Sequence, residues 1–494
     1  MKHQVQVQTD EKSDMPIVPK KLPNKGGNPA EVMEGRGIAK GNVDKFTASP
    51  TQSGTNGASK GLEGIRKIAK EDSRIQFTAL LHHITPSLLV ECFYALKRQA
   101  AAGMGGVTWR EYEGMLYERV HDLHREIHTG AYKARPSRRV YIPKADGRLR
   151  PLGIAALEDK IVQQAVVTVL NEIYEADFLG FSYGFRVNRS QHNALDALAI
   201  GIERRKVNWI LDADIRSFFD EIDHEWMMRF LEHRISDKRI LRLIRNWLKA
   251  GVIEGGKRVA AIRGTPQGAV ISPLLANIYL HYAFDLWAHQ WRQQQAVGDV
   301  IVVRYADDSV MGFQHEREAK QFLRALRIRM AKFGLTLHPD KTRLIRFGRY
   351  AAQQRKERDE RKPETFDFLG FTHCCGQSSH GFKLIRLTVK KRMRATLAAM
   401  RETMMRRRHE PIPVQGRWLR RVVQGYLNYY AVPGNMRRLN GFRTQVGRLW
   451  RKALLRRSQR NRMPWSRFAR LVSKYLPRCY ALHPLPAERF CVST

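Results

Sequence analysis

Hydrophobic positions along the chain change their spacing several times, and these changes divide it into segments of different predicted structure. Residues 1–60 are rich in Gly, Ser, Thr, Asn, Lys and Pro without sustained periodicity, which predicts a disordered arm. From about residue 61, apolar side chains recur at helical intervals and predict two helices separated at Thr85-Pro86. These apolar positions are Phe77, Leu80, Leu81 and Ile84, then Leu88, Leu89, Cys92, Phe93 and Leu96. Residues 111–128 repeat the pattern.

The spacing then becomes typical of strands. Arg138–Lys144 and Arg148–Ile154 flank Asp146-Gly147, a dipeptide that favours a tight hairpin turn. A long helix is predicted over Glu158–Glu175. Thr265–Leu280 starts with a Pro-Gln-Gly turn and continues as an apolar helix.

Two adjacent acids interrupt the apolar run from residue 300 to 313. The segment Tyr305–Asp308 lies between two β-branched or apolar stretches, which predicts a tight hairpin with Asp307 and Asp308 at its tip. Charge is costly there unless a cation is bound, and carboxylate oxygens suit Mg²⁺. A solvated turn is the alternative, because Asp is common in turns.

A third acid upstream favours the metal site. Residues 208–214 predict a strand in which period two places Asp212 and Asp214 on one face. A polymerase needs carboxylates from two elements to hold two divalent ions about 4 Å apart. Asp214, Asp307 and Asp308 fit this requirement, whereas Asp212 and Asp220 are expected to form structural hydrogen bonds or face water.

The charge of the chain indicates a polyanionic partner. It has 87 Lys and Arg against 47 Asp and Glu, a net charge of +40. Residues 391–480 alone carry 24 Lys and Arg and two acids, which is more than half of the net charge. A merely solvated helical surface does not require such crowding of one sign. An acidic membrane surface is a weaker candidate, because no lipid anchor signal accompanies the charge.

Length and cysteine usage set the broad class. With 494 residues and 43% hydrophobic content, the chain has room for two to four domains with real cores. No run of 18 apolar residues and no apolar N-terminal signal is present, so we expect a soluble cytoplasmic protein that does not enter a membrane. The five cysteines show neither CxxC nor zinc spacing and are expected to be reduced thiols.

Other segments supply candidate contacts to a nucleotide or a strand end. Lys144 and Arg150 on the basic hairpin would clamp a triphosphate, or only protect an edge strand. Gln267 can present an amide to a base or sugar, and Gly268 allows close approach of a backbone. Lys341 would donate a proton to pyrophosphate, or pair with its neighbour Asp340. The aromatic alternation of residues 366–371 suits either packing against sugars or core packing.

These motifs, in this order, resemble the group II intron-encoded reverse transcriptases, also called maturases. The resemblance covers residues 70–490 and includes the hairpin over 138–154, Ser182–Arg186, Asp214–Phe219, Thr265–Pro273 and Tyr305–Asp308. It continues through Lys341-Thr342, Phe368–Phe371 and Trp418–Asn435. One departure is Val187-Asn188, where the family usually has Pro-Gly.

The resemblance implies an α+β fold: a right-hand polymerase whose fingers and palm, an antiparallel sheet plus helices, precede an all-helical thumb. The expected segments are the arm (1–60), a helical extension of the fingers (61–135), fingers and palm (136–374), the thumb or maturase domain (375–480) and a tail (481–494). Asp214, Asp307 and Asp308 would hold two Mg²⁺ ions, and Phe219 would reject a ribose 2′-hydroxyl. Tyr305 and Phe368-Leu369-Gly370 would contact primer and template.

The thumb region adds a predicted RNA surface, because Arg can fork phosphates and stack on bases among interleaved aromatics. Its candidate residues are Arg406, Arg407, Arg420, Arg421, Arg437, Arg438, Arg456 and Arg457. An aromatic core coated with Arg is the alternative, and Tyr426, Tyr429 and Tyr430 are expected to fill that core.

The expected function is Mg²⁺-dependent, RNA-directed DNA synthesis by a bacterial protein that also binds its intron RNA to assist splicing. The expected partners are intron RNA, a DNA target or primer and deoxynucleoside triphosphates, and a dimer is left open. No HNH nuclease module is expected after the thumb. Two alternatives remain: a splicing factor with a vestigial polymerase site, and an intron-free reverse transcriptase used in defence or DNA repair.

Overall fold

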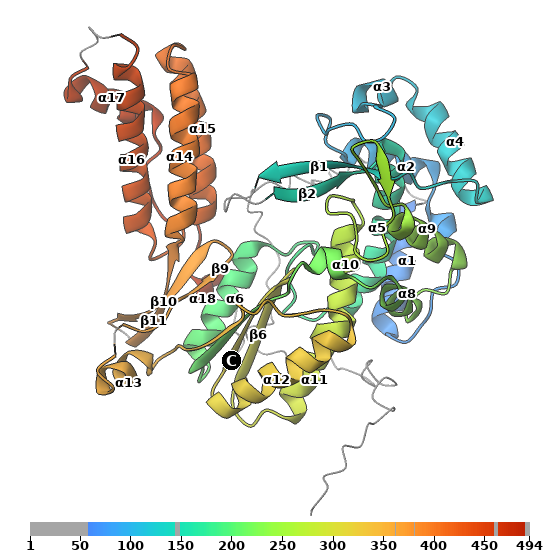
Figure 1. Cartoon of the computed structure of the whole chain (residues 1–494), viewed down its shortest axis with the longest axis horizontal. Helices are drawn as coiled ribbons and strands as arrows, with labels where there is room; N and C mark the ends of the chain where they lie inside the picture. Colours follow the sequence, from blue (N-terminus) through green and yellow to red (C-terminus); the bar gives the residue numbers. More distant parts are fainter. Residues whose placement is uncertain (1–57, 144–148, 361, 380, 459–462, 490–494) are drawn as a thin grey trace, which may run out of the picture.

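The computed structural model describes residues 58–143, 149–360, 362–379, 381–458 and 463–489. Figure 1 shows N-terminal helices and a β-hairpin on one side, a central sheet below, and a separate helical bundle on the other side. Helices and mostly antiparallel strands occur in separate regions of the chain, so the predicted α+β class is confirmed.

The N-terminal lobe is helical and packs on one long helix. Thr85 caps the second helix, since its side chain accepts a hydrogen bond from the Leu88 N–H and Pro86 occupies the first turn. The long helix predicted over Glu158–Glu175 is α5. The elements of the lobe are α1 (Ala58–Glu71), η1 (Leu81–His83), α2 (Pro86–Ala95), α3 (Trp109–Glu113), α4 (Leu116–Thr129) and α5 (Leu157–Asp177).

The helix predicted to include Phe77 and Ile84 is wrong: only the short 3-10 turn η1 forms there. The Phe77 N–H donates to the Arg234 carbonyl, and the Phe77 carbonyl accepts from Ser236 and Asp237. The Asp237 carboxylate accepts the N–H groups of Leu80 and Leu81. These distant partners satisfy the backbone without a helix, while the apolar side chains are still buried.

The basic hairpin predicted over residues 138–154 forms as β1 (Ser137–Pro143) and β2 (Leu149–Ile154), which pair antiparallel. Lys144 and Asp146-Gly147 lie outside the described residues. In Figure 1 the hairpin points towards the helical bundle. Its sheet has the order β2-β1-β4-β5, with β4 (Val252–Glu254) and β5 (Lys257–Val259) following α8 (His224–Glu232) and α9 (Lys238–Lys249).

The central sheet has the order β6-β7-β3-β8 and separates two hydrophobic cores. Val300 and Val302 point to the core that includes helix α12, whereas Ile301 and Val303 point to the core that includes helix α6. The strands are β3 (Trp209–Asp214), β6 (Val300–Tyr305), β7 (Asp308–Phe313) and β8 (Arg343–Arg346). The helices are α6 (Gln191–Arg204), α7 (Phe218–Glu221), α10 (Ser272–Leu280), the π-helix η2 (His281–Asp285), α11 (Leu286–Gln294) and α12 (Glu316–Lys332).

A small sheet of order β11-β10-β9 connects the central sheet to the helical bundle. Its strands are β9 (Phe366–Phe368), β10 (Phe371–Ser378) and β11 (Gly381–Thr388), and α13 (Ala351–Glu357) precedes them. The predicted start of an all-helical region at residue 375 is therefore wrong, because that position lies inside β10. The bundle helices are α14 (Lys390–Arg406), α15 (Ile412–Tyr430), α16 (Met436–Leu455) and α17 (Trp465–Tyr475).

The described part of the predicted C-terminal tail returns to the central lobe. Helix α18 (Pro486–Arg489) lies beside α6, and Arg489 pairs with the buried Asp196 at 3.1 Å. Asp196 also accepts from Arg386 at 2.6 Å. Asp196 of α6 therefore joins β11 and α18, which lie close to α6 in Figure 1. None of the described helices is long and apolar enough to span a lipid bilayer.

Candidate active site

The turn between β6 and β7 presents the two adjacent acids. The strands are antiparallel, with Tyr305 opposite Asp308, so Ala306 and Asp307 form a two-residue turn. Ala306 has φ 56°. A positive φ at the first turn residue is typical of a type II′ or I′ hairpin, whose twist suits the flanking strands. The predicted hairpin is confirmed.

Asp214 ends β3 at the level of this turn. In the antiparallel pair of β3 and β7, Asp214 is the direct partner of Asp308. Ile210 and Val310 belong to the core on the α6 side, and alternation places Asp212, Asp214 and Asp308 on that same face of the sheet. The structure thus brings together the two segments that carry the acids.

The crowded carboxyl groups hold their protons more tightly than free ones. Removal from water, followed by repulsion from Asp307, Asp214 and Asp212, raises the pKa of Asp308 to about 7, although one side of this residue faces solvent. Removal from water also raises the pKa of Asp212 to about 6 and that of Asp307. This concentration of negative charge favours a bound cation.

Basic side chains face the acids from three other elements. Lys341 pairs with Asp214 rather than with Asp340, so the simple neighbour pair considered from the sequence is not formed. Arg343 lies 3.7 Å from Asp212. The charges of Arg150 and Lys341 act on Asp307 in the direction that lowers its pKa.

The donor set suits a hard divalent cation, although the described residues contain no ready-made metal cluster. No group of three or more His, Cys, Asp and Glu side chains in that part of the chain is arranged to hold a metal ion. The carboxylates of Asp214, Asp307 and Asp308 are nevertheless oxygen donors from two elements, and their mutual repulsion is the kind that a cation relieves. Their role as metal ligands stays a prediction.

Asp308→Asn should stabilise the protein when divalent ions are absent. The pKa of Asp308 is raised to about 7 in the folded protein. Its contribution to folding stability is therefore fully present below its pKa in the unfolded chain and is lost as pH rises through about 7. We expect a higher melting temperature than the parent, with a larger gain at pH 8 than at pH 5, measured by differential scanning fluorimetry with EDTA. Asp122→Asn on the exposed face of α4 is the control. An unchanged melting temperature at pH 8 would contradict the raised pKa of Asp308.

The Pro266–Gly268 loop packs against the base of the basic hairpin. The Gln267 carbonyl accepts from the Gly153 N–H at 2.7 Å, and a Cβ at Gly268 would lie 2.9 Å from the Gly153 oxygen. The Gly268 φ of 110° also requires glycine. The predicted close approach at Gly268 is therefore to β2, and the Gln267 side chain is half-buried.

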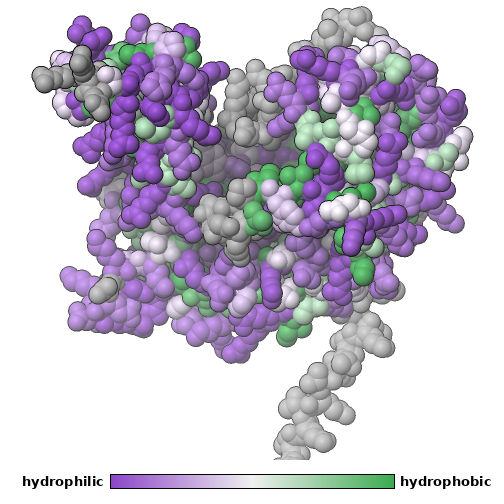
Figure 2. Space-filling model, turned by 45° about the horizontal axis from the view of Figure 1, so that its top comes forward, coloured by the Kyte–Doolittle hydropathy of each residue, from purple (hydrophilic) through white to green (hydrophobic). Residues whose placement is uncertain are grey.

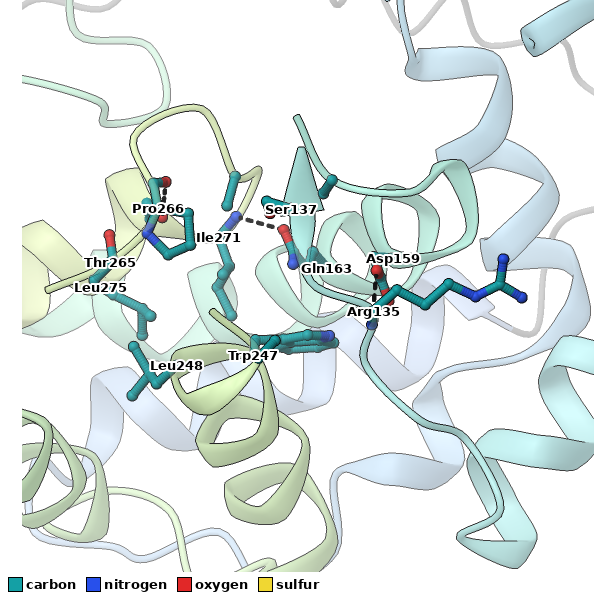
Figure 3. Close-up of a pocket in the computed structure, with 14 residues that line it drawn as sticks. Arg135, Ser137, Asp159, Gln163, Trp247, Leu248, Thr265, Pro266, Ile271 and Leu275 are labelled. Carbon is teal, nitrogen blue, oxygen red and sulfur yellow. Dashed lines mark hydrogen bonds between the residues drawn. The ribbon is translucent and has the colours of Figure 1, made fainter. Parts of the chain in front are cut away.

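Gln163 of α5 holds the other end of this loop (Figure 3). Its side-chain oxygen accepts the N–H groups of Val270 at 3.0 Å and Ile271 at 3.4 Å. A cavity of about 10 Å³ separates the loop from Asp159 and Trp247, which is no more than the space of a single water. The loop is consequently fixed by two elements, β2 and α5.

Phe219 lies in α7, which follows β3 of the central sheet, and the predicted strand-end contacts lie in and directly after β9 of the small sheet. Phe219 is half-buried in α7, and its carbonyl accepts from the Thr265 N–H at 2.8 Å, so the helix adjoins the Pro266 loop. Phe368 is buried in the core, whereas Leu369 and Gly370 form the turn before β10 with φ of 46° and 83°. Tyr429 of the bundle donates to the Leu369 carbonyl at 2.6 Å. Core packing therefore accounts for Phe368.

The candidate arginines of the bundle divide into two groups. Arg407 and Arg457 are half-buried and both bond Glu410, and Arg438 is also half-buried. The exposed ones are Arg406, Arg420, Arg421, Arg437 and Arg456. Tyr426, Tyr429 and Tyr430 pack against the cores as expected.

Two exposed arginines line a groove between α14 and α16. Arg406 and Arg456 share it with Arg401, Lys452 and Glu402, and its volume is about 650 Å³. Figure 2 shows a largely hydrophilic surface over the bundle and a hollow between the bundle and the N-terminal lobe. The groove is a candidate surface for a polyanion.

Sequence reasoning missed several basic residues at these sites. Arg343 pairs with Asp212. Arg392, in the first turn of α14, acts on Asp308 in the direction that lowers its pKa. Period two from Asp212 does not indicate Arg343, because their pairing depends on the register between β3 and β8. Arg401 and Lys452 also line the groove but belong to none of the adjacent Arg pairs from which the RNA surface was predicted.

The departure at Val187-Asn188 keeps the backbone shape that a glycine would allow. Asn188 has φ 61°, the left-handed conformation that Asn tolerates better than most residues.

Comparison with known proteins identifies the domain that contains these acids. Residues 142–373 match the family described as reverse transcriptase (RNA-dependent DNA polymerase). These residues therefore form a reverse transcriptase domain, a class that generally uses divalent metal ions.

The curated relatives of this domain include proteins described as intron proteins, and the chain spans less than two thirds of the length of the first relatives it matches. The chain is 39% identical over 229 residues to Protein YkfC of Escherichia coli K12, covering 45% of this chain and 60% of the relative. It is 36% identical over 222 residues to the group II intron-encoded protein LtrA of Lactococcus lactis subsp. cremoris, 44% of this chain and 37% of the relative. A third match, 26% over 163 residues (32% and 21%), is the nuclear intron maturase 3, mitochondrial, of Arabidopsis thaliana. The resemblance to group II intron-encoded reverse transcriptases is confirmed.

Proposed function

We propose that this chain is an Mg²⁺-dependent, RNA-directed DNA polymerase. The observation that carries the proposal is the pairing of Asp214 with Asp308 beside the Asp307 turn, in a domain of the reverse transcriptase family. Two Mg²⁺ ions, held by Asp214, Asp307 and Asp308, would activate the primer hydroxyl and neutralise phosphate charge. Each of the three carboxylates is an oxygen donor of the type that Mg²⁺ binds.

The basic side chains around the acids have complementary roles in this proposal. Arg150, whose charge reaches Asp307, would hold the triphosphate together with Lys144. Lys341 would hold a proton close to the leaving pyrophosphate, and its pairing with Asp214 keeps it at the site.

The remaining candidates would shape the nucleotide and primer sites. Phe219 adjoins the Pro266 loop, where it would exclude a 2′-hydroxyl, and Gln267 and Gly268 would border the nucleotide or template. Tyr305 and the Leu369-Gly370 turn would contact the primer end. Tyr429 fixes that turn from the bundle.

We further propose that the bundle binds intron RNA, since the relatives of this chain include a group II intron-encoded protein and an intron maturase. The groove between α14 and α16 supplies concentrated positive charge for phosphates. Splicing chemistry would belong to the RNA, and the protein would stabilise its fold. Copying of the intron at a DNA target would use the polymerase site.

Primer extension on the full-length protein tests the polymerase proposal. A DNA primer annealed to a heteropolymeric RNA, with deoxynucleoside triphosphates and Mg²⁺, should be extended, and EDTA or Asp214→Asn should stop the extension. Absence of templated DNA synthesis by the parent protein, at any Mg²⁺ concentration, would overturn the proposal.

A splicing factor with a vestigial polymerase site is the second candidate, and the crowded basic surface of the bundle is what favours it. Intron splicing with an Asp307→Ala variant separates the two activities. Splicing rescue by that variant, with a parent protein that makes no DNA, would select the vestigial site.

A further inference from the structure

Arg304, immediately before Tyr305, is buried beneath the acidic turn. Its side chain is 1% exposed and pairs with Asp285, which is 0% exposed, at 2.5 Å. A charge so far from water is retained only where neighbouring groups satisfy it. The pair has no part in the proposed polymerase chemistry.

All five N–H groups of Arg304 have acceptors. Nε donates to Asp285 Oδ1 at 2.7 Å, and Nη2 donates to Asp285 Oδ2 at 2.5 Å and Ser182 Oγ at 2.6 Å. Nη1 donates to Asn277 Oδ1 at 3.2 Å and to the Ala306 carbonyl at 3.0 Å. A guanidinium is the one side chain with five donors in a rigid plane, so lysine cannot reproduce this set.

One of these contacts reaches the turn itself. Ala306 is the first residue of the turn and has φ 56°, a conformation that alanine adopts only under constraint. The Arg304 Nη1 bond to the Ala306 carbonyl fixes the peptide that joins Ala306 to Asp307. The orientation of this peptide sets the direction of the Asp307 side chain.

A second segment holds the turn from behind. A Cβ at Gly184 would lie 2.2 Å from the Ala306 nitrogen, so the two backbones are in close contact. Asn277 donates to the Gly184 carbonyl at 2.7 Å and accepts from Arg304. Arg304 and Asn277 thus connect both sides of this backbone contact.

The counter-ion comes from an unusual helix. Asp285 ends the π-helix η2, which follows α10 without a break. A π-helical turn is rare and frequently marks a functional site. Here it occurs in the segment that places the Asp285 carboxylate against both Nε and Nη2 of Arg304.

We infer that Arg304 is a positioning residue for the catalytic turn: with Asp285 and Asn277 it forms a buried clamp that fixes the orientation of Asp307 and Asp308. The inference rests on the proposed polymerase function and adds to it the element that keeps the metal-binding carboxylates aligned. Arg304 acts through the turn, because its side chain is buried and its donors are all bonded to protein acceptors.

Arg304→Lys tests the clamp, and Arg234→Lys is the matched control. Arg234 is also a buried arginine, paired with Asp177 at 2.9 Å, but its carbonyl acceptors are Ala69, Asp72 and Ile75, in the N-terminal lobe. Both variants should lose thermal stability. Only Arg304→Lys should lower kcat for primer extension, by about 10²-fold as expected for a displaced reacting group, with KM for primer-template unchanged.

The Mg²⁺-induced shift in melting temperature is a second measurement, which does not depend on catalysis. Mg²⁺ should raise the melting temperature of the parent and of Arg234→Lys, and this shift should be much smaller for Arg304→Lys. If the parent makes no DNA, the polymerase proposal fails and the Mg²⁺-induced shift alone decides the clamp. Equal kcat losses, or equal Mg²⁺ shifts, in the two lysine variants would overturn the clamp.

A double variant guards against simple misfolding. Arg304→Met with Asp285→Leu removes both charges together, which often preserves folding of a buried pair. The Ala306 carbonyl would still lack its donor, so kcat should stay low. A folded double variant with parental kcat and a parental Mg²⁺-induced shift would show that the turn needs no clamp.

Discussion

Asp307→Asn should reduce RNA-templated primer extension by at least ~10³-fold while leaving RNA affinity unchanged. The amide keeps the shape of the side chain but removes a charged oxygen from the set formed with Asp214 and Asp308. Loss of one electrostatic group that acts at the transition state already costs about 10²–10³ in kcat, and a lost metal ligand should cost no less. Single-turnover extension at saturating Mg²⁺ is the measurement.

Asp340→Asn is the control for Asp307→Asn, because Asp340 is exposed and adjoins Lys341, which pairs with Asp214. It changes the charge beside the site without touching the turn, and extension should remain within a few-fold of the parent. If Asp307→Asn also stays within about tenfold of the parent, Asp307 is not a metal ligand and the proposed site is wrong.

The sequence was sufficient for the parts of the site that depend on local backbone rules. The two-residue turn at Ala306-Asp307 follows from apolar strands on both sides of it, and the strand before Asp214 follows from its period of two. Once both strands enter one antiparallel sheet, the register brings Asp214 opposite Asp308. The family resemblance then indicated which chemistry the three acids serve, namely metal binding in a polymerase.

Contacts between distant polar groups could not be predicted from the sequence. Lys341 was expected either to serve pyrophosphate or to pair with Asp340, yet it pairs with Asp214. Arg304 passed unnoticed inside an apolar run, because nothing local indicates that Asp285 and Asn277 will meet it. Buried polar networks depend on the packing of several elements, which no single segment specifies.

The helical spacing of apolar residues gave a wrong prediction around Phe77, where the side chains are buried without a helix. Phe77 and Leu80 are buried at helix-like intervals, but their backbone groups bond residues around Asp237 instead of their own neighbours. The prediction that the helical region begins at residue 375 is wrong because strands continue past that residue. The aromatic and β-branched residues of β10 and β11 extend the sheet before the bundle begins.

Replacing the four basic residues of the α14–α16 groove should weaken RNA binding by roughly 10²-fold near physiological salt. The variant is R401Q, R406Q, K452Q and R456Q, which line one groove together with Glu402. Each phosphate contact releases counterions and contributes about 0.7 to the slope of log affinity against log salt for single-stranded RNA. The slope should therefore fall by about 3, measured by filter binding over a range of salt concentrations.

The matched control removes the same charge from another surface. Helix α12 covers the face of the central sheet opposite to α6. Its exposed basic residues are Arg317, Lys320, Arg324 and Arg327. Their combined replacement by glutamine should leave the salt slope close to the parental value. Equal loss of affinity in the two quadruple variants would mean that net charge, and not the groove, attracts the RNA. A non-specific electrostatic field depends on the total charge, whereas a binding site depends on the position of its charges.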